Sequence, residues 1–363
     1  MKFYEITFRL LSPAIISARR TGRGYLLPLS YIPASTLRGA ILTHLYWRGV
    51  LDEEGLEGEA SNPRVIASPA YPMRMDKRSY PCHPFAYKCK VDGETCNYAS
   101  EALKKLERGE NPTLRSTCSR GHLALKQLHP SPVVPRDGGL EGVELPNHWS
   151  VSVGMSRDRA SSRRGLLFEY EALGVGLEFW ATLALPEELA EGVWRGMRFR
   201  VGRGISRGFG LAEVTGKREV KLAGEAGRVV NAMRGGRLIL YALSPTSRIE
   251  GEGSTPLPDV IELSEIAERC ELEAEGRLIF KRGFGRAGLY HMGWDIKRGV
   301  MRPRIRAAHP GSIYMVEVEG GGGEFEEALA ALRFLGTLEE ADGHPITGLN
   351  LLTPLRGHPM EGV

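Results

Sequence analysis

The stretch of sequence most suited to chemistry is a glycine- and arginine-rich segment at residues 202–210. It combines four glycines with two arginines: Gly202, Arg203, Gly204, Arg207, Gly208 and Gly210. Glycine permits positive φ and close backbone approach, so backbone amides can point at phosphates while arginines neutralise them. The segment lacks the Lys-Ser/Thr ending of a P-loop and the spacing of a dinucleotide fingerprint. It indicates a polyanion-binding loop, and a tight hairpin turn is the structural alternative.

Cysteines form a second group of residues with chemical potential. Four of the five lie close together in the sequence: Cys82, Cys89, Cys96 and Cys118. Four thiolates, or three with a histidine such as His83 or His122, can fix one tetrahedral zinc ion. The gaps between these cysteines are longer than in standard zinc motifs, so disulfides and simple buried cysteines remain alternatives. We predict a structural zinc site on Cys82, Cys89, Cys96 and Cys118.

The third group of candidate functional residues is a set of arginines that cluster at four places in the sequence. The net charge is only +4. The clusters are Arg19, Arg20 and Arg23; Arg157, Arg159, Arg163 and Arg164; Arg198, Arg200, Arg203 and Arg207; and Arg298, Arg302, Arg304 and Arg306. The planar arginine fork suits phosphates and base stacking, so these clusters are candidate polyanion-binding surfaces. The alternative is solvated surface in an arginine-rich composition.

The elements that must position these residues begin with a strand at residues 2–10, where apolar and polar residues alternate. A basic loop follows Ser12-Pro13. A helix is predicted to begin at Pro33 and to run to about Arg48, with Ser35 or Thr36 available to cap its amides. The order is therefore strand, basic loop, helix.

Further along the chain, the periodic pattern disappears and then resumes. Residues 52–150 are rich in Pro, Gly, Cys and His, and such a stretch orders only if something holds it together. We interpret it as an insertion. A second cycle begins at Gly236, where a strand ends in Leu-Ser-Pro at residues 243–245 as the first does at residues 11–13. The predicted linker is 216–235.

Three of these segments resemble motifs of one family, in the family's order. Residues 31–40 (YIPASTLRGA) resemble the signature that opens the first helix of CRISPR-associated RAMP proteins, with Ala34 where that family usually has glycine. Residues 155–169 resemble its basic hairpin and strand, and residues 202–210 are similar to its glycine-rich loop. The C-terminal half matches less well, because its terminal segment 343–348 lacks arginines.

The resemblance implies an α+β fold with two ferredoxin-like (RRM-like, βαββαβ) RAMP domains in tandem. They span 1–215, with the Cys/His-containing insertion at about 52–150, and 236–363, which is degenerate. It also implies a large RNA-binding subunit of a type III (III-D-like) CRISPR effector, which holds the 5′ handle of the crRNA and caps the complex in antiviral defence. The implied partners are crRNA, the large polymerase-like subunit and backbone RAMP subunits.

The resemblance and the arginine clusters together give a set of expected RNA contacts. They are Arg19, Arg20, Arg23, Ser35, Thr36, Arg38, Arg157, Arg159, Arg163, Gly202, Arg203, Gly204, Arg207, Gly208 and Gly210. Phosphate contacts would supply affinity, and Tyr25, Tyr31 or Phe209 would stack on unpaired bases. No membrane contact is expected, and the N-terminus lacks the apolar stretch of a secretory signal, so we expect a cytoplasmic protein.

Catalysis is the less favoured interpretation. Target-cutting backbone subunits of the family carry an aspartate between the first strand and the signature helix, whereas residues 15–30 contain no acid here. The alternative is a metal-independent endoribonuclease of the RAMP superfamily that processes pre-crRNA, with His44 or a tyrosine as acid or base. A zinc-stabilised protein-interaction module is a third hypothesis. It predicts that salt barely changes RNA affinity, whereas phosphate binding weakens steeply with salt.

Overall fold

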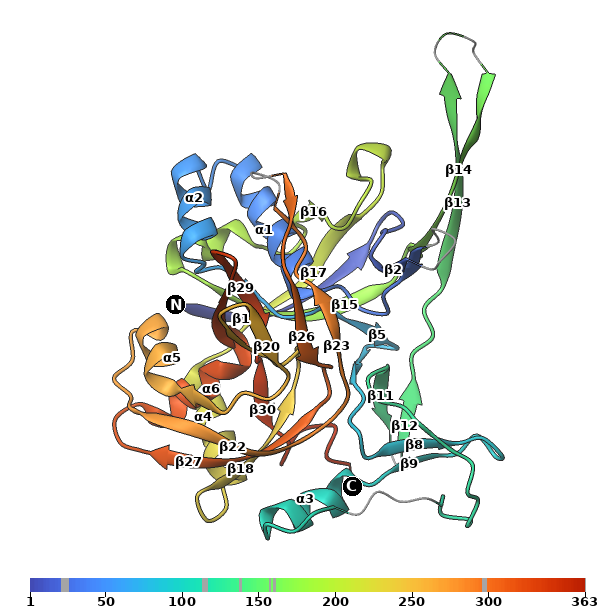
Figure 1. The fold of residues 1–363 in the computed structure, drawn as a ribbon. Coiled ribbons are helices and arrows are strands. Elements are labelled where there is room, and N and C mark those ends of the chain that lie inside the picture. Colours follow the sequence, from blue (N-terminus) through green and yellow to red (C-terminus); the bar gives the residue numbers. More distant parts are fainter. Residues whose placement is uncertain are drawn as a thin grey trace.

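Two antiparallel sheets organise the chain in the computed structural model (Figure 1). The structure describes residues 1–20, 26–112, 117–136, 139–156, 158, 161–295 and 299–362. The first sheet is built from residues 2–219 and the second from residues 237–354. Predicted α+β character is confirmed. No helix in these ranges is long and apolar enough to cross a bilayer.

The first sheet is centred on the predicted N-terminal strand. Its members are β1 (Lys2–Leu10), β4 (Ile66–Ala67), β5 (Tyr71–Arg74), β6 (Lys77–Arg78), β15 (Glu178–Leu185), β16 (Arg198–Arg200) and β17 (Leu211–Glu219). β1 lies between β15 and β17, β4 and β5 continue the sheet beyond β15, and β16 extends it beyond β17. All these pairs are antiparallel. The range predicted as an unpatterned insertion therefore supplies three strands of the main sheet, β4, β5 and β6.

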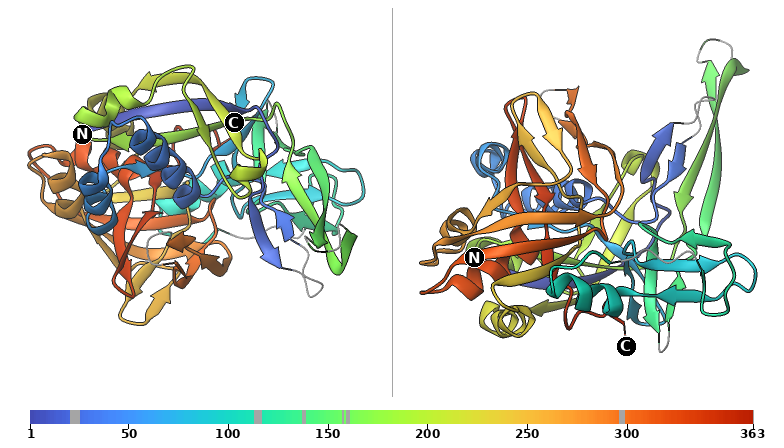
Figure 2. Two further views of the ribbon diagram at one scale, coloured as in Figure 1. Left: turned by 90° about the horizontal axis from the view of Figure 1, so that it is seen from above. Right: turned by 60° about the horizontal axis from the view of Figure 1, so that its bottom comes forward.

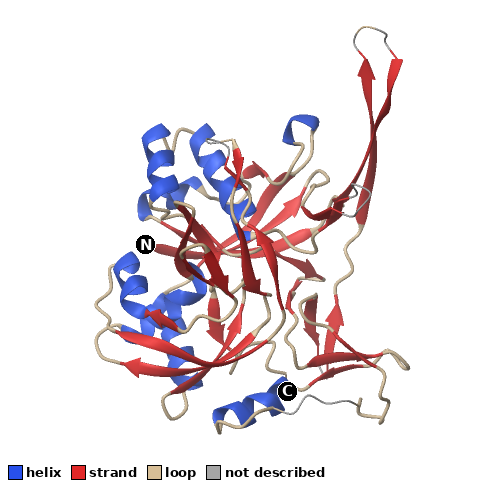
Figure 3. Ribbon diagram, viewed as in Figure 1, coloured by secondary structure: helices blue, strands red, loops and turns tan. Residues whose placement is uncertain are grey.

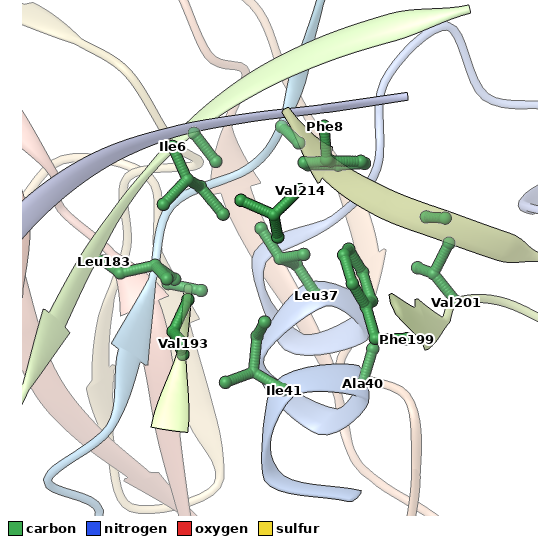
Figure 4. Packing of buried hydrophobic residues seen from close by; sticks show 14 of the residues in the cluster. Ile6, Phe8, Leu37, Ala40, Ile41, Leu183, Val193, Phe199, Val201 and Val214 are labelled. Atoms are coloured by element: carbon green, nitrogen blue, oxygen red, sulfur yellow. The ribbon is translucent and has the colours of Figure 1, made fainter. Parts of the chain in front are cut away.

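Helix α1 (Ala34–Trp47) covers one face of this sheet, as its apolar spacing predicts. Leu37 and Ile41, one turn apart, are fully buried against Ile6 and Phe8 of β1 and Val214 of β17 (Figure 4). The N-cap is Pro33 and makes no side-chain cap. The expectation that Ser35 or Thr36 caps the helix is therefore wrong, because the helix begins one residue before Ser35.

The second sheet runs in the order β21-β22-β27-β18-β30. Its strands are β18 (Arg237–Ala242), β21 (Val260–Glu262), β22 (Gly276–Phe284), β27 (Ile313–Gly320) and β30 (Leu352–Pro354). Helix α5 (Leu263–Cys270) precedes β22, and α6 (Phe325–Leu335) lies between β27 and β30. Most of the predicted linker, residues 216–235, forms helix α4 (Leu222–Ala232). This helix packs on α6.

The two sheets share one strand arrangement. Along the chain, four strands of the second sheet are β18, β22, β27 and β30. Across the sheet they lie in the order β30-β18-β27-β22, which is fourth, first, third, second along the chain. Across the first sheet the corresponding strands lie in the order β17-β1-β15-β4/β5, which is again fourth, first, third, second along the chain. Where the second sheet has α6, the first has only the 3-10 helix η1 (Glu187–Gly192). Each half is thus strand, helix, two strands, connection, strand.

An inserted segment, residues 79–177, separates β6 from β15. It contains β7 (Tyr80–Pro81), β8 (Ala86–Cys89), β9 (Thr95–Asn97), α3 (Ala99–Glu107), β10 (Leu125–Gln127), β11 (Pro132–Arg136), β12 (Gly139–Gly142), β13 (Asn147–Ser156) and β14 (Ser161–Leu173). The β13–β14 hairpin projects far from the body of the molecule (Figures 1 and 2). Helix α2 (Glu53–Ser61) precedes this segment and lies beside α1 (Figure 3).

Several two-stranded ribbons complete the fold. They are β2 (Ser17–Arg20) with β3 (Leu26–Pro28), β19 (Arg248–Glu250) with β20 (Gly253–Thr255), β23 (Ala287–His291) with β26 (Arg304–Ala308), β24 (Trp294–Asp295) with β25 (Val300–Met301), and β28 (Thr337–Ala341) with β29 (His344–Leu349). Ribbons of this length pack on a neighbour to be stable. Here three of them contact one another in the C-terminal half.

Candidate nucleic-acid interface and metal centre

The glycine-rich loop joins β16 to β17 and contains the short 3-10 helix η2 (Ile205–Arg207). Gly202, Gly204, Gly208 and Gly210 all have positive φ, between 72° and 92°. A Cβ at Gly210 would lie 2.0 Å from the carbonyl oxygen of Val201, and one at Gly202 would lie 2.6 Å from that of Ile15. Side chains are therefore excluded at both positions by conformation and by space.

The loop presents two arginines to solvent. Arg203 and Arg207 are exposed, and neither makes an ion pair with any described residue. The Arg207 guanidinium carbon lies 4.6 Å from the ring centroid of Tyr170 on β14 and 5.9 Å from that of Phe209. These are cation–π distances, which orient the guanidinium while leaving its charge uncompensated. Sequence reasoning missed Tyr170, because only the fold brings β14 beside the loop.

Backbone hydrogen bonds fix this loop against the segment that follows β1. The amide of Arg203 donates to the carbonyl of Ile15 (3.1 Å), and that of Gly210 donates to Pro13 (2.7 Å). Arg200 braces the loop from within, since its Nη1 donates to the carbonyls of Ile205 and Phe209 at 3.4 and 3.3 Å. The loop therefore keeps a defined shape beside the chain that leads into β2.

The first arginine cluster enters this region through the β2–β3 ribbon. Arg19 and Arg20 are the last residues of β2, and β3 contacts β14. The positions of the Arg19 and Arg20 side chains, and all of Arg23 and Tyr25, lie outside the described residues. The structure thus brings the backbone of Arg19 and Arg20 and the glycine-rich loop to one region, beside the part of β14 that contains Tyr170.

Arg38 has a structural role that the sequence did not reveal. Its Nε donates to the carbonyl of Val65 (2.7 Å), and its Nη2 donates to a carboxylate oxygen of Glu59 (2.7 Å). The Arg38 side chain is 12% exposed and that of Glu59 only 6%. Three of the five N–H donors of Arg38 are thus used by Val65 and Glu59, so the side chain braces the fold, and its expected RNA contact stays a prediction.

Ser35 and Thr36 are half-buried at the start of α1, where the two halves of the chain meet. A Cβ at Gly348 of β29 would lie 2.3 Å from the Ala34 Cβ, and one at Gly293 would lie 3.9 Å from the Ser35 hydroxyl. Gly348 has φ +77°. The glycine-containing turn near the C-terminus therefore packs against the signature helix, and its lack of arginine fits a packing role.

Arg163 of the basic hairpin lies further along β14 than Tyr170, the residue that contacts the glycine-rich loop. Arg163 is near the tip end of β14, its side chain outside the described set, and Arg157 and Arg159 lie outside the described residues altogether. Arg163 precedes Tyr170 by seven residues, which is roughly 23 Å along a strand. The backbone of Arg163 therefore lies well away from Tyr170 and the glycine-rich loop.

Two further expected contacts have other partners. Tyr31 packs on Tyr71, with ring centroids 5.7 Å apart, and burial raises its pKa to about 12 despite a hydrogen bond with Tyr290. His44 lies against Trp194, with ring centroids 5.5 Å apart, and burial lowers its pKa. Its Nε2 has no hydrogen-bond partner among the described residues. Of the expected stacking residues that the structure describes, Tyr31 and Phe209, only Phe209 lies at the loop.

Four potential metal ligands, two of them cysteines, lie close together at the β8–β9 hairpin. Four ligand atoms lie within 4.8 Å of one another, from Cys89, Asp92, Cys118 and His122. The Cys89 Sγ is 3.5 Å from the His122 Nδ1, which is 3.3 Å from an Asp92 carboxylate oxygen. In tetrahedral zinc sites, Zn–S and Zn–N bonds of about 2.3 and 2.0 Å place sulfur and nitrogen about 3.5 Å apart. The group therefore fits zinc.

The predicted ligand set changes in two positions. Cys82 is fully buried in another apolar cluster, where burial raises its pKa and its thiol faces the carbonyl of His83. Cys96 packs against Cys89 and Cys118 but is outside the ligand group. Asp92 and His122 take the places of Cys82 and Cys96. The amide of Glu94 donates to Asp92 and lowers the pKa of its carboxyl, which favours the ionised ligand form.

Comparisons with known proteins give structural likenesses only. No protein-family model matches the chain, and no curated protein is significantly similar in sequence. A chain in the cryo-EM structure of the Type III-B Cmr-beta bound to cognate target RNA is similar at 10% identity, over 86% of each chain, with a TM-score of 0.48. Oligomeric Cmr4 from Pyrococcus furiosus is similar at 13% identity, over 61% of this chain and 99% of that chain, with a TM-score of 0.27. A chain of a Type IV-B CRISPR complex is similar at 15% identity, over 60% of this chain and 90% of that chain, with a TM-score of 0.24.

Proposed function

We propose that the chain is an RNA-binding subunit of the RAMP superfamily that works in a type III CRISPR effector complex and holds the 5′ handle of the crRNA. The observation that carries the proposal is the glycine-rich loop. It combines four positive-φ glycines with two exposed arginines that have no acidic partner among the described residues. Such a loop offers backbone amides and uncompensated guanidinium groups to phosphates.

The architecture supports the same proposal. Both sheets have the strand order fourth, first, third, second, and the second adds both helices of a βαββαβ unit. That order supports two ferredoxin-like domains in tandem, at about 1–215 and 236–363. The first domain carries the family-like signature on α1 and the glycine-rich loop at β16–β17, so the motif resemblance and the topology agree in sequence order.

The proposal assigns the RNA contacts to one region and to one outlying element. Arg203, Arg207 and the loop glycines, with Arg19, Arg20 and Arg23, would bind the handle's phosphates, while Phe209 would stack on an unpaired base. Ser35 and Thr36 would line the junction between the halves. The hairpin arginines Arg157, Arg159 and Arg163 would reach RNA or a neighbouring subunit further out. Zinc on Cys89, Asp92, Cys118 and His122 would stabilise the inserted segment.

The test is a fluorescence-anisotropy titration of the purified chain with a guide RNA that carries the host's repeat-derived 5′ handle. A scrambled handle, two salt concentrations and the variant Arg207→Ala complete the design. The matched control is Arg108→Ala, which removes an exposed arginine at the end of α3. We expect handle-selective binding that weakens with salt and is reduced at least several-fold by Arg207→Ala but not by Arg108→Ala.

The outcomes separate the hypotheses. Equal affinity for both handles would contradict handle recognition, and unchanged binding by Arg207→Ala would remove the loop from the site. Recovered RNA is run on a gel, because a cut at one unique phosphate would replace the binding role with the endoribonuclease alternative. Binding that is insensitive to salt would favour a protein-interaction module.

A further inference from the structure

The β23–β26 ribbon has two faces of opposite character. Its inner face is buried in a small core of the C-terminal half: Tyr290, Met292, Ile305 and Ala307 pack with Ala341, Ile346 and Leu349. Its outer face carries Leu289, His291, Arg304 and Arg306, and all four are exposed, Leu289 by 71%. Because the inner face already anchors the ribbon, the outer face is not needed for folding.

The outer-face residues form one compact array. Leu289 is directly opposite Arg306, and His291 is directly opposite Arg304. Side chains opposite each other in an antiparallel pair have Cβ atoms about 5 Å apart, and neighbours on one face of a strand are about 7 Å apart. The four side chains therefore present two cations, an imidazole and an aliphatic group on a single surface.

The charge of this surface is not balanced locally. Neither Arg304 nor Arg306 makes an ion pair with any described residue. Residues 286–309 contain six Lys and Arg residues against one acid, Asp295. The adjacent β19–β20 hairpin contains Glu250, which pairs with Arg248 at 3.8 Å, and Glu252 at its turn, and no ion pair joins either of them to Arg304 or Arg306 among the described residues. Two unpaired arginines on a flat ribbon make a local positive potential that attracts a polyanion.

We propose that the outer face of the β23–β26 ribbon is a second binding surface, for single-stranded RNA. Arg304 and Arg306 would contact phosphates, while His291 and Leu289 would pack against an unstacked base. The inference rests on the proposed function for its ligand class and adds a contact in the C-terminal half, whose terminal turn has no arginines. An acidic protein segment is the competing occupant.

The test measures single-stranded RNA binding by the double variant Arg304→Ala/Arg306→Ala as a function of salt. Its control, Lys104→Ala/Arg108→Ala, removes two exposed charges from α3. Loss of two phosphate contacts lowers the log–log salt slope by about 1.4 and weakens binding about tenfold or more, whereas the control stays within about twofold. Ultraviolet crosslinking of the wild-type complex should label the peptide containing residues 289–306.

The remaining outcomes distinguish this surface from the glycine-rich loop. If Arg207→Ala weakens binding but Arg304→Ala/Arg306→Ala leaves affinity and salt slope unchanged, the second surface is overturned and the proposed function stands. If the wild-type chain binds no RNA, both fall. Arg304→Lys/Arg306→Lys keeps the charge and should restore the slope, which a folding defect would not allow. Unchanged RNA binding with lost binding of polyglutamate would identify the acidic protein segment instead.

Discussion

Arg333 of α6 donates a hydrogen bond of 2.7 Å from Nη2 to Oε1 of Glu5 on β1, and so connects the second half of the chain to the central strand of the first. Glu5 is only 5% exposed and also accepts from Arg78 (2.8 Å) and Arg218. Arg333 donates in addition to Glu225 of α4 (2.8 Å). One buried carboxylate thus holds guanidinium groups from three separate segments.

The first prediction concerns the loss of that carboxylate charge. Glu5→Gln keeps the shape but leaves Arg78 and Arg218 without their counter-ion and Arg333 with only Glu225. Removal of one partner from a buried ion pair costs about 3–5 kcal/mol. We expect a drop of that size in the free energy of unfolding, measured by urea titration. The control Glu178→Gln breaks the more exposed pair with Arg9 and should cost at most about 1 kcal/mol. Equal losses would contradict the special role of Glu5.

The second prediction concerns acid stability. Burial raises the pKa of Glu5, but Arg78, Arg333 and Arg218 outweigh it and lower the pKa to about 2 from the usual 4.5. A depressed carboxyl pKa stabilises the fold above pH 4.5, and this contribution disappears as the pH falls towards 2. The difference in unfolding free energy between wild type and Glu5→Gln should therefore shrink below pH 4.5. A constant difference down to pH 2.5 would argue against the shift.

The third prediction concerns buried histidines and begins at higher pH. Burial lowers the pKa of His83 to about 3, of His129 to about 4 and of His358 to about 3. The unfolded chain takes up protons below pH 6.5 while these folded-state imidazoles stay neutral, so stability is lost as pH falls from 6.5 towards 4. Each histidine contributes up to about 1.4 kcal/mol per pH unit. Urea titrations at pH 7, 6 and 5 measure the slope, which His358→Phe should reduce.

The fourth prediction concerns the metal centre. The purified chain should carry one zinc ion per molecule by mass spectrometry, and chelation should lower its melting temperature. Cys118→Ser should lose the metal, whereas Cys82→Ser should keep it, because Cys82 lies in a different cluster. Asp92→Asn should weaken zinc binding, since it replaces an anionic ligand with a neutral one. Zinc retained by Cys118→Ser would show that the ligand group is assigned wrongly.

The fifth prediction concerns the conformation of the glycine-rich loop. Gly210→Ala would place a Cβ 2.0 Å from a carbonyl oxygen, whereas Gly208→Ala meets nothing within 4 Å, although both positions have positive φ. Gly208→Ala should therefore cost only the roughly 1–2 kcal/mol of a left-handed alanine. Gly210→Ala should cost more and also reduce RNA affinity, because the loop must shift. Thermal melts and anisotropy check both.

Local sequence patterns predicted the features that depend on near neighbours. The apolar spacing of Leu37 and Ile41 predicted α1, and the clustered glycines predicted a turn that needs positive φ. Features that depend on distant partners were missed. From the sequence alone Arg38 is a candidate RNA contact, because its ion pair with Glu59 is visible only in the folded structure. Asp92 becomes a candidate ligand only because the β8–β9 hairpin turns it towards Cys118 and His122.

The contact between the two halves has a consequence for the order in which the chain is made. Phe3, Ile66 and Ala184 of the first sheet are buried in the same apolar cluster as Phe334 of α6. A ribosome that adds about 5–20 residues per second needs roughly 8–30 s to proceed from the end of β15 to the end of α6. During that interval the nascent first half exposes an apolar sheet face that its own sequence cannot cover. Premature termination before α6 would therefore release an aggregation-prone fragment. During synthesis, a chaperone could bind this exposed face before the chain is complete and able to bind RNA.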